Sequence, residues 1–169
     1  MYQKSAGGAQ EEELLVKSPD DDLPSSWSAD GRFLLYTAEN IHTGTDLWVL
    51  PLDASGAKAG EPKPFLRTDF NEQFAHLSQD SRWVAYISDE SGRAEIYVRA
   101  FTPTPSGGPA ESGKWLVSQG ARSAPVWTNG GRELMYIDSG SKRNHCRSYR
   151  SSPLSGWAAE SSFPVARRV

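Results

Sequence analysis

The chain has 169 residues, of which 37% are hydrophobic and 23% charged, and its formal net charge is −3. This length and composition predict one globular unit with enough chain to bury an apolar core. The last 31 residues hold six Lys or Arg against one acid. The body before them is therefore acidic, which argues against a nucleic-acid backbone as its partner.

The sequence carries no segment typical of export or of a membrane span. Its N-terminus lacks the apolar core of a signal peptide, and no apolar run approaches the ~20 residues that a membrane helix needs. As written, the chain is expected to be soluble and cytoplasmic. Its one cysteine, Cys146, cannot form an internal disulfide, so cysteine usage does not indicate whether the protein works in an oxidising or a reducing compartment.

In chain order, the apolar segments are short and are separated by turn residues, which predicts strands rather than helices. Residues 1–12 predict a flexible lead-in, and residues 13–17 predict a single strand. Residues 18–67 predict a unit of four strands, residues 68–118 repeat it, and residues 119–138 supply its first half again. In the first unit one expected strand ends at Trp27 and the others lie at 33–37, 46–51 and 64–66. In the second unit the expected strands lie at 74–77, 83–87, 95–98 and 115–117, and in the third they lie at 125–127 and 134–137.

The units are copies of one another at a spacing of fifty residues. The hexapeptide Trp-Ser-Ala-Asp-Gly-Arg at 27–32 returns as Leu-Ser-Gln-Asp-Ser-Arg at 77–82 and as Trp-Thr-Asn-Gly-Gly-Arg at 127–132. A fixed period of this size is typical of repeat proteins in which each unit packs on its neighbours. Residues 13–17 correspond to the fourth strand of such a unit. The register also superposes Tyr36, Tyr86 and Tyr136, and Val16, Leu66 and Leu116.

Residues 139–169 break this pattern. Cys146, Tyr149 and Trp157 stand isolated among Ser, Arg and Lys residues, and no strand template fits for long. The segment is expected to be an irregular basic tail, disordered or loosely docked. The alternative is that it is not the natural continuation of the repeat, through truncation or a shifted reading frame.

Four short strands per unit, at a period near the ~40–50 residues of propeller families, describe one blade of a β-propeller. The Trp-Ser-x-Asp-Gly-Arg motif is followed by an apolar strand ending in Tyr and by an acidic-apolar-aromatic-Val strand at 46–49 and 95–98. This pattern resembles the WD-like repeat of TolB-type propellers, which is also found in bacterial receptor-type serine/threonine kinases and in propellers attached to serine peptidases. The resemblance covers residues 13–138. It implies the fold and a family that is often extracytoplasmic, and it says little about activity.

Three blades do not close a ring, because propellers contain about four to eight. The strand at 13–17 is a fourth strand without the rest of its unit, and the third unit lacks its fourth strand, so each could complete the other. The sequence therefore predicts an all-β protein, a partial propeller of about three four-stranded antiparallel blades. It is expected to close as a six-bladed ring when two chains form a homodimer, each 13–17 strand completing the last blade of the other.

The repeated motif residues are expected to be structural. Asp30 and Asp80 are suited to cap backbone N–H groups in tight turns, and Gly31 supplies a positive φ. Trp27 and Trp127 recur at the repeat spacing and are expected to pack in the core.

The candidate binding residues precede or begin the first strand of each unit. Asp22, Glu72 and Arg122 are equivalent in the register, and with Asn71 and His76 they are predicted to line the mouth of the central channel. Solvated loop acids are the competing interpretation, and Asp20 and Asp21 belong to the same acidic group.

A calcium site is the alternative interpretation of this mouth. Carboxylate and amide oxygens are the ligands that Ca²⁺ prefers, and it takes about six to eight of them. The residues that offer these oxygens are Asp22, Asp69, Asn71 and Glu72.

The sequence favours a ligand-binding or protein-binding module, a sensor or scaffold that needs no cofactor. It has no Gly-x-Ser-x-Gly elbow, phosphate loop, zinc spacing or kinase motif. The expected partners are a second copy and a protein or small molecule, with no nucleic acid and no membrane. Because propeller lactonases hold a channel metal, a calcium-dependent hydrolase of lactones or similar esters is the alternative that the resemblance leaves open.

Overall fold

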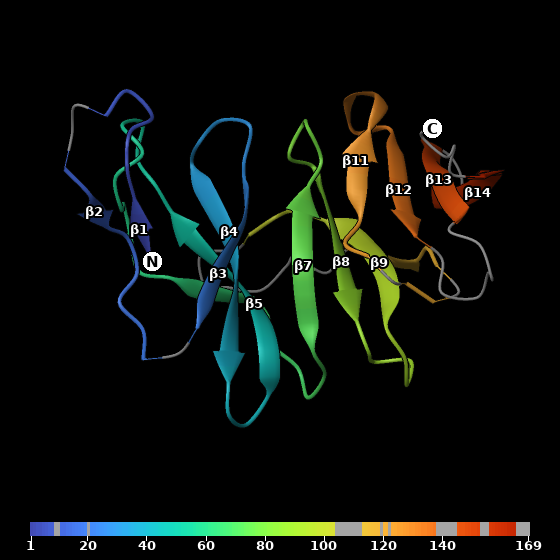
Figure 1. The fold of residues 1–169 in the computed structure, drawn as a ribbon, viewed down its shortest axis with the longest axis horizontal. Coiled ribbons are helices and arrows are strands. Elements are labelled where there is room, and N and C mark those ends of the chain that lie inside the picture. Colours follow the sequence, from blue (N-terminus) through green and yellow to red (C-terminus); the bar gives the residue numbers. More distant parts are fainter. Residues whose placement is uncertain are drawn as a thin grey trace, which may run out of the picture.

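The computed structural model describes residues 1–8, 11–19, 21–103, 113–118, 120–121 and 123–137, and the backbone of 145–152 and 156–164. The described part contains strands, turns and one 3-10 turn at Asn129–Gly131, with no α-helix. Consequently, no helix in these residues is long and apolar enough to span a bilayer. Three four-stranded antiparallel sheets stand side by side along the chain (Figure 1). The predicted all-β fold with three blades is confirmed.

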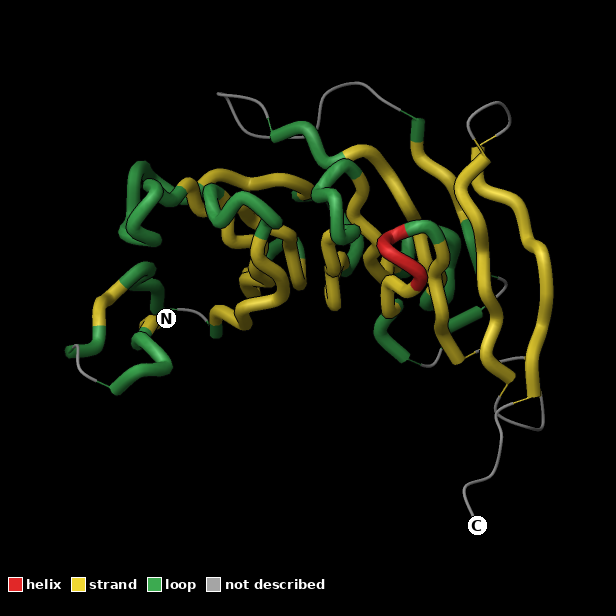
Figure 2. Tube along the Cα trace, turned by 90° about the horizontal axis from the view of Figure 1, so that it is seen from above, coloured by secondary structure: helices red, strands yellow, loops and turns green. Residues whose placement is uncertain are grey.

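Each blade is an antiparallel meander whose strands follow one another in chain order. Figure 2, seen from above, shows the sheets as successive layers. A separate pair of short strands, β1 and β2, lies beside the first blade. The strands are β1 (Tyr2–Gln3), β2 (Glu13–Leu14), β3 (Asp22–Trp27), β4 (Phe33–Asn40), β5 (Gly44–Pro51) and β6 (Lys63–Leu66) up to the end of the first blade, β7 (Glu72–Leu77), β8 (Trp83–Ser88), β9 (Glu95–Ala100) and β10 (Lys114–Leu116) in the second, and β11 (Val126–Thr128), β12 (Glu133–Ile137), β13 (His145–Ser152) and β14 (Gly156–Pro164) in the third.

The repeated hexapeptide forms the tight turn between the first two strands of a blade. The Ser28 hydroxyl donates to Asp30 Oδ1 over 2.7 Å and accepts the Phe33 N–H over 2.9 Å. Asp30 Oδ1 also accepts the Arg32 N–H over 3.1 Å. These bonds satisfy backbone groups that the turn leaves unpaired, which is why the motif needs a hydroxyl and a carboxylate two residues apart. The same bonds recur in the second blade among Ser78, Asp80, Arg82 and Trp83.

Each blade has two apolar faces, because alternate residues of a strand point to opposite sides of the sheet. We call the face toward the preceding blade the front face and the face toward the following blade the back face. In β4, Leu34 and Tyr36 lie on the front face and Leu35 lies on the back face. The core between the first two blades joins Leu35, Leu47, Val49, Phe65 and Leu66 to Ala75, Leu77, Val84, Tyr86, Tyr97 and Phe101.

The core between the second and third blades repeats this arrangement one unit later. The back face of the second blade supplies Ile96 and Val98, and the front face of the third blade supplies Leu134 and Tyr136. All four side chains are at most 2% exposed. Joints of this kind, rather than the interior of any one sheet, hold most of the apolar core.

The N-terminal segment lies on the front face of the first blade. Leu15 and Val16, 2% and 7% exposed, pack with Leu34 and Tyr36. Their place relative to the first blade is the place that Phe65 and Leu66 have relative to the second. Residues 15–16 therefore sit where the outer strand of a preceding blade belongs. Within the flexible lead-in that the sequence predicts, the structure has strand β1, which pairs with β2.

The C-terminal segment differs from the sequence-based expectation. Instead of an irregular tail throughout 139–169, the backbone forms β13, which pairs with β12, and β14, which pairs with β13. The third blade thus has four strands from its own chain. Strand pairing requires only backbone N–H and C=O groups and a free edge, which β12 offers, so it does not depend on the apolar pattern that the prediction needed.

The outer strand of the second blade is shifted by one residue from the fifty-residue register. Val117, rather than Leu116, takes the buried position of Leu66, and its N–H donates to the Ile96 carbonyl over 2.8 Å. Leu116 is instead 55% exposed. The fifty-residue register therefore no longer holds after the long loop that precedes β10, because this loop accommodates an added residue.

We predict that Leu47→Ala destabilises the protein by about 2–5 kcal/mol, because it leaves a cavity in the joint between the first two blades. Leu47 is 0% exposed. Urea unfolding at a fixed pH measures the change. Ile41→Ala, at a residue 93% exposed, is the matched control and is expected to stay within about 0.5 kcal/mol of the parent. Equal midpoints for the two variants would contradict the assigned joint.

Candidate functional site

Two buried carboxylates meet where the first and second blades join. Glu72, the first residue of β7, is 1% exposed, and Asp46, near the start of β5, is 0% exposed. Glu72 Oε1 accepts the Thr68 hydroxyl over 2.6 Å. Asp46 Oδ2 accepts the Thr43 hydroxyl over 2.6 Å and lies 3.8 Å from Arg67 Nε. Each carboxylate therefore accepts one side-chain hydroxyl, the backbone of Thr68 also donates to Asp46, and Arg67 lies at the outer limit of an ion pair with it.

Each of these carboxylates also has one buried oxygen that no hydrogen bond reaches. These atoms are Asp46 Oδ1 and Glu72 Oε2. Burial raises the pKa of Asp46. Burial also raises the pKa of Glu72 to about 7, against the opposing Thr68 hydrogen bond, and the Asp46 charge adds to the rise. The arrangement therefore favours a proton on Glu72 up to neutral pH, since desolvation and a like charge both disfavour the ionised form.

The equivalent acid of the second blade is fully paired. Glu95, 1% exposed, lies 2.6 Å from Arg93 Nε, and its other oxygen accepts the Ser118 hydroxyl and the Gly120 N–H. An unpaired buried carboxylate oxygen is thus a feature of the joint between the first two blades and not of every third strand. A buried polar atom without a partner costs about 1–3 kcal/mol, and a proton on Glu72 reduces this cost at the joint between the first two blades.

Asn71 links the two blades beside this acidic pair. Its side-chain nitrogen donates to Asp89 Oδ2 over 2.7 Å, and its own N–H donates to Asp89 Oδ1 over 2.9 Å. Its Oδ1 accepts the Thr45 N–H of the first blade over 3.2 Å. A Cβ at Gly44 would lie 2.4 Å from this oxygen, so the approach requires glycine there. Asn71 is therefore committed to a structural bridge.

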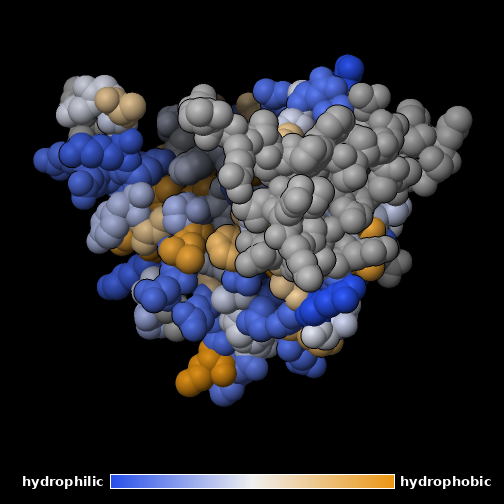
Figure 3. Space-filling model, turned by 45° about the vertical axis from the view of Figure 1, so that its right-hand side comes forward, coloured by the Kyte–Doolittle hydropathy of each residue, from blue (hydrophilic) through white to orange (hydrophobic). Residues whose placement is uncertain are grey.

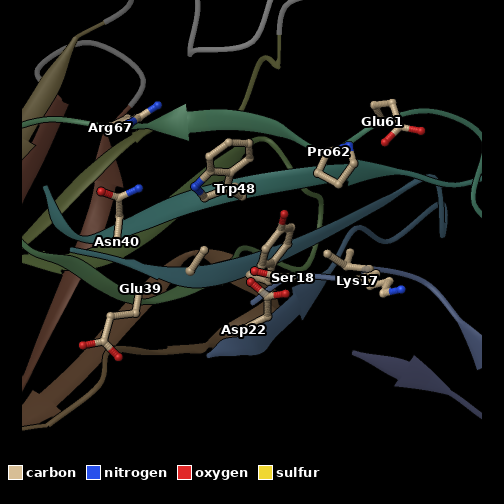
Figure 4. Close-up of a pocket in the computed structure, with 12 residues that line it drawn as sticks. Lys17, Ser18, Asp22, Glu39, Asn40, Trp48, Glu61, Pro62 and Arg67 are labelled. Atoms are coloured by element: carbon tan, nitrogen blue, oxygen red, sulfur yellow. The ribbon is translucent and has the colours of Figure 1, made fainter. Parts of the chain in front are cut away.

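Asp22 lies apart from this pair, on the front face of the first blade. It lines an open hollow of about 400 Å³ together with Ser18, Tyr36 and Trp48. Figure 4 shows Ser18 and Asp22 close together, with Trp48 on another strand of the same hollow. Burial, followed by the charge of Asp22, raises the pKa of Tyr36. The register equivalents Asp22 and Glu72 thus occupy different surroundings, because only Glu72 has a preceding blade packed against it.

The remaining predicted mouth residues do not join one cluster. His76 lies further along β7, where its carbonyl accepts the Trp127 indole N–H over 2.8 Å, and burial lowers the pKa of its imidazole. Asp69 and Asp21 are exposed. Arg122 and Asp20 lie outside the described residues.

The calcium alternative finds no support in this geometry. Within the described ranges, no group of three or more His, Cys, Asp or Glu side chains is placed to hold a metal ion. Of the expected ligands, Asn71 bridges to Asp89 and Glu72 is buried against Thr68. The donor set that Ca²⁺ requires is therefore not assembled by these side chains.

The innermost strands form a second candidate surface. β3 contacts β7 and β7 contacts β11, and each carries an exposed apolar side chain: Leu23 at 61%, Phe74 at 49% and Val126 at 57% exposure. Phe74 has φ 53°, at an irregularity in the pairing of β7 with β8. A left-handed conformation costs a non-glycine residue about 1–2 kcal/mol, and such strain clusters at functional sites.

Sequence reasoning missed Asp46 and Phe74. An acid before an apolar strand occurs twice, at Asp46 and Glu95, and this repetition was a signal for a buried carboxylate. Phe74 falls in an apolar strand, where its aromatic ring predicts burial. Phe74 is turned outward by the irregular pairing of β7 with β8, and no pattern in the sequence predicts this irregularity.

These sheets and joints define the chain as part of a β-propeller, and its fold is TolB-like. No protein-family model and no curated protein matches the sequence. A solved structure of a TolB-type protein from Agrobacterium tumefaciens is similar, with a TM-score of 0.57 and 16% identity over 90% of this chain and 53% of that one. TolB from Acinetobacter baumannii also aligns, with a TM-score of 0.26 and 13% identity over 86% of this chain and 55% of that one. The chain thus spans about half the length of these proteins.

We predict that Glu72→Gln stabilises the protein relative to its parent as pH rises. The folded pKa of Glu72, about 7, exceeds its ordinary value of 4.5, so its contribution is fully present below pH 4.5 and is lost as pH rises through 7. The loss amounts to about 3 kcal/mol. Glutamine cannot ionise, so the stability difference between the two proteins should grow over this window.

Urea unfolding at intervals from pH 4 to pH 8 measures this difference. Glu61→Gln is the control, because Glu61 is an exposed residue in a surface ion pair with Lys58. A constant difference between Glu72→Gln and the parent across the window would contradict a buried, protonated Glu72.

We also predict that removing calcium leaves the protein unchanged. A site filled at a hundredfold its Kd would contribute about 2.7 kcal/mol to stability. Thermal unfolding with excess EDTA and with millimolar Ca²⁺ should give the same midpoint. A midpoint raised by Ca²⁺, together with turnover of a simple lactone, would restore the hydrolase alternative.

Proposed function

We propose that this chain is a protein-binding propeller module without chemistry of its own, and that the innermost strands carry its binding surface. The observation that supports this most directly is Phe74, an aromatic side chain exposed on β7 through a strained backbone. Aromatic anchors of this kind contribute most to binding energy in protein interfaces. An exposed phenylalanine otherwise lowers solubility without a structural gain.

The apolar side chains continue across the blades. Leu23 lies on the strand before Phe74 and Val126 lies on the strand after it, and the strands are in contact. Exposed apolar side chains on three neighbouring strands suit an extended peptide segment better than a compact small molecule, which needs an enclosed pocket. Figure 3 shows hydrophobic side chains lying between hydrophilic ones on the face that it draws.

A second copy of the chain is one of the proteins that we expect it to bind. The front face of the first blade is covered by Leu15 and Val16, and beside them a hollow of about 400 Å³ stays open, which a second copy would fill. Two chains of three blades give six, which is within the range of closed propellers. Phe74 lies on the second blade, whose two faces are packed against blades of its own chain, so a substitution at Phe74 tests the peptide-binding surface separately from the homodimer.

We predict that peptides selected on the protein bind through Phe74. A random-peptide display library is panned on the purified chain, and the affinity of a selected peptide is measured by calorimetry. Phe74→Ser should weaken binding about tenfold or more, because it removes the central anchor. Serine keeps the fold because Phe74 is half-exposed.

Ile41→Ser is the matched control for this measurement. Ile41 is 93% exposed in the loop between β4 and β5, away from the innermost strands. Peptides whose affinity falls equally with both variants, or with neither, would contradict a binding surface at Phe74.

A further inference from the structure

The front face of the first blade carries half of a joint between blades. In the complete joint behind it, Tyr86 of the second blade packs against Phe65 and Leu66 of the preceding outer strand and against the back-face residues Leu35 and Leu47. On the first blade, Leu15 and Val16 supply the outer-strand part of the same contact with Tyr36. No counterpart of Leu35 or Leu47 lies there among the described residues, and the hollow of about 400 Å³ opens at this place.

The polar contacts of the joints show the same difference. Trp127 of the third blade donates its indole N–H to the His76 carbonyl of the second over 2.8 Å. A Cβ at Gly131 would lie 3.0 Å from the Gln79 nitrogen, so these two turns touch. The equivalent residues of the first blade contact nothing comparable. Trp27 is 46% exposed, and a Cβ at Gly31 would meet no atom within 4 Å.

We propose that this front face binds the third blade of a second copy, and that residues 13–17 pair with β13 of that copy in place of its own β14. This inference rests on the proposed function, because it names one protein partner of the module. In this two-fold dimer, the front face of each first blade packs on the back face of the partner's third blade, so the ring closes with six blades.

The third blade offers the groups that the first blade requires. The register places Val126 where His76 lies, so its carbonyl is in position to accept the Trp27 indole N–H. Met135, 38% exposed, takes the back-face position of Leu35. The strand pairing places His145 at the position of Asp46. In the closed ring the backbone position of His145 therefore lies across the joint from Asp22, as Asp46 lies across from Glu72 between the first two blades.

The outer-strand position favours residues 13–17 over β14. The sequence Glu-Leu-Leu-Val-Lys at 13–17 follows the pattern of Lys-Pro-Phe-Leu-Arg at 63–67, with the apolar residues that enter the joint. β14 has Ala, Glu and Ser over most of its length. Its place beside β13 is thus held by backbone pairing, which an apolar strand can equally supply.

The register fixes which residues meet. Leu66 pairs with Leu47 in the first blade. Val16 corresponds to Leu66 and Cys146 corresponds to Leu47, so Val16 of one copy should face Cys146 of the other. In the single chain Cys146 pairs with Phe163. Facing residues in an antiparallel pair lie within the Cα separation that a disulfide spans.

Disulfide trapping between two chains tests this pairing. A Val16→Cys, Cys146→Ser chain is mixed with the parent chain, whose only cysteine is Cys146, and the mixture is oxidised mildly. The expected product is a heterodimer whose peptide map joins positions 16 and 146. An Ile41→Cys, Cys146→Ser chain serves as the collision control and should give at least tenfold less of this product.

The solution mass of the parent chain completes the test. Sedimentation should show a dimer, and Trp27→Phe should weaken it about 25-fold to 100-fold, because one hydrogen bond is lost in each of the two joints. A folded monomer at tens of micromolar, or a dimer without the 16–146 link, would overturn the inference. Peptide binding at Phe74 would be unaffected by either outcome, so the proposed function would be judged separately.

Discussion

The packing of one blade face on the next is the constraint on which this structure depends. A four-stranded sheet with Leu34 and Tyr36 on one side and Leu35 on the other buries these side chains only when both of its faces are covered. The second blade has both, and its Val84, Ala85 and Tyr86 are at most 1% exposed. Stability therefore belongs to the joints, as in other repeat proteins, and the end faces decide what the module associates with.

The joints differ in their polar groups although their apolar cores are alike. Between the first two blades, two acids share a buried site and leave one oxygen each without a partner. Between the next two, Glu95 is paired with Arg93 and with donors from the outer strand. Since burial of an unpaired charge costs more than an apolar contact returns, the first joint is loosened when Glu72 ionises.

The sequence was sufficient for the strands and for their order, because the turn motif and the alternation of apolar residues repeat locally. It did not predict β13 and β14, whose pairing is a property of the backbone and of the free edge of β12. It placed Glu72 at an open channel mouth, whereas Asp46 and Thr68 enclose it. The burial of Glu72 depends on contacts between blades. The fifty-residue register aligns the sequences of the blades, and such an alignment does not show how the blades pack.

Residues 13–17 connect these findings, since they combine an apolar strand with a position that belongs to a preceding blade. In the single chain their backbone is satisfied in part by the short strand β1, and Leu15 and Val16 are buried against the first blade. A two-residue partner supplies few hydrogen bonds, and a hollow lined in part by Trp48 and Tyr36 stays open beside it. A full-length third strand from another blade satisfies both the backbone and the hollow, so the sheet that completes this joint has to present a long free edge and an apolar back face together.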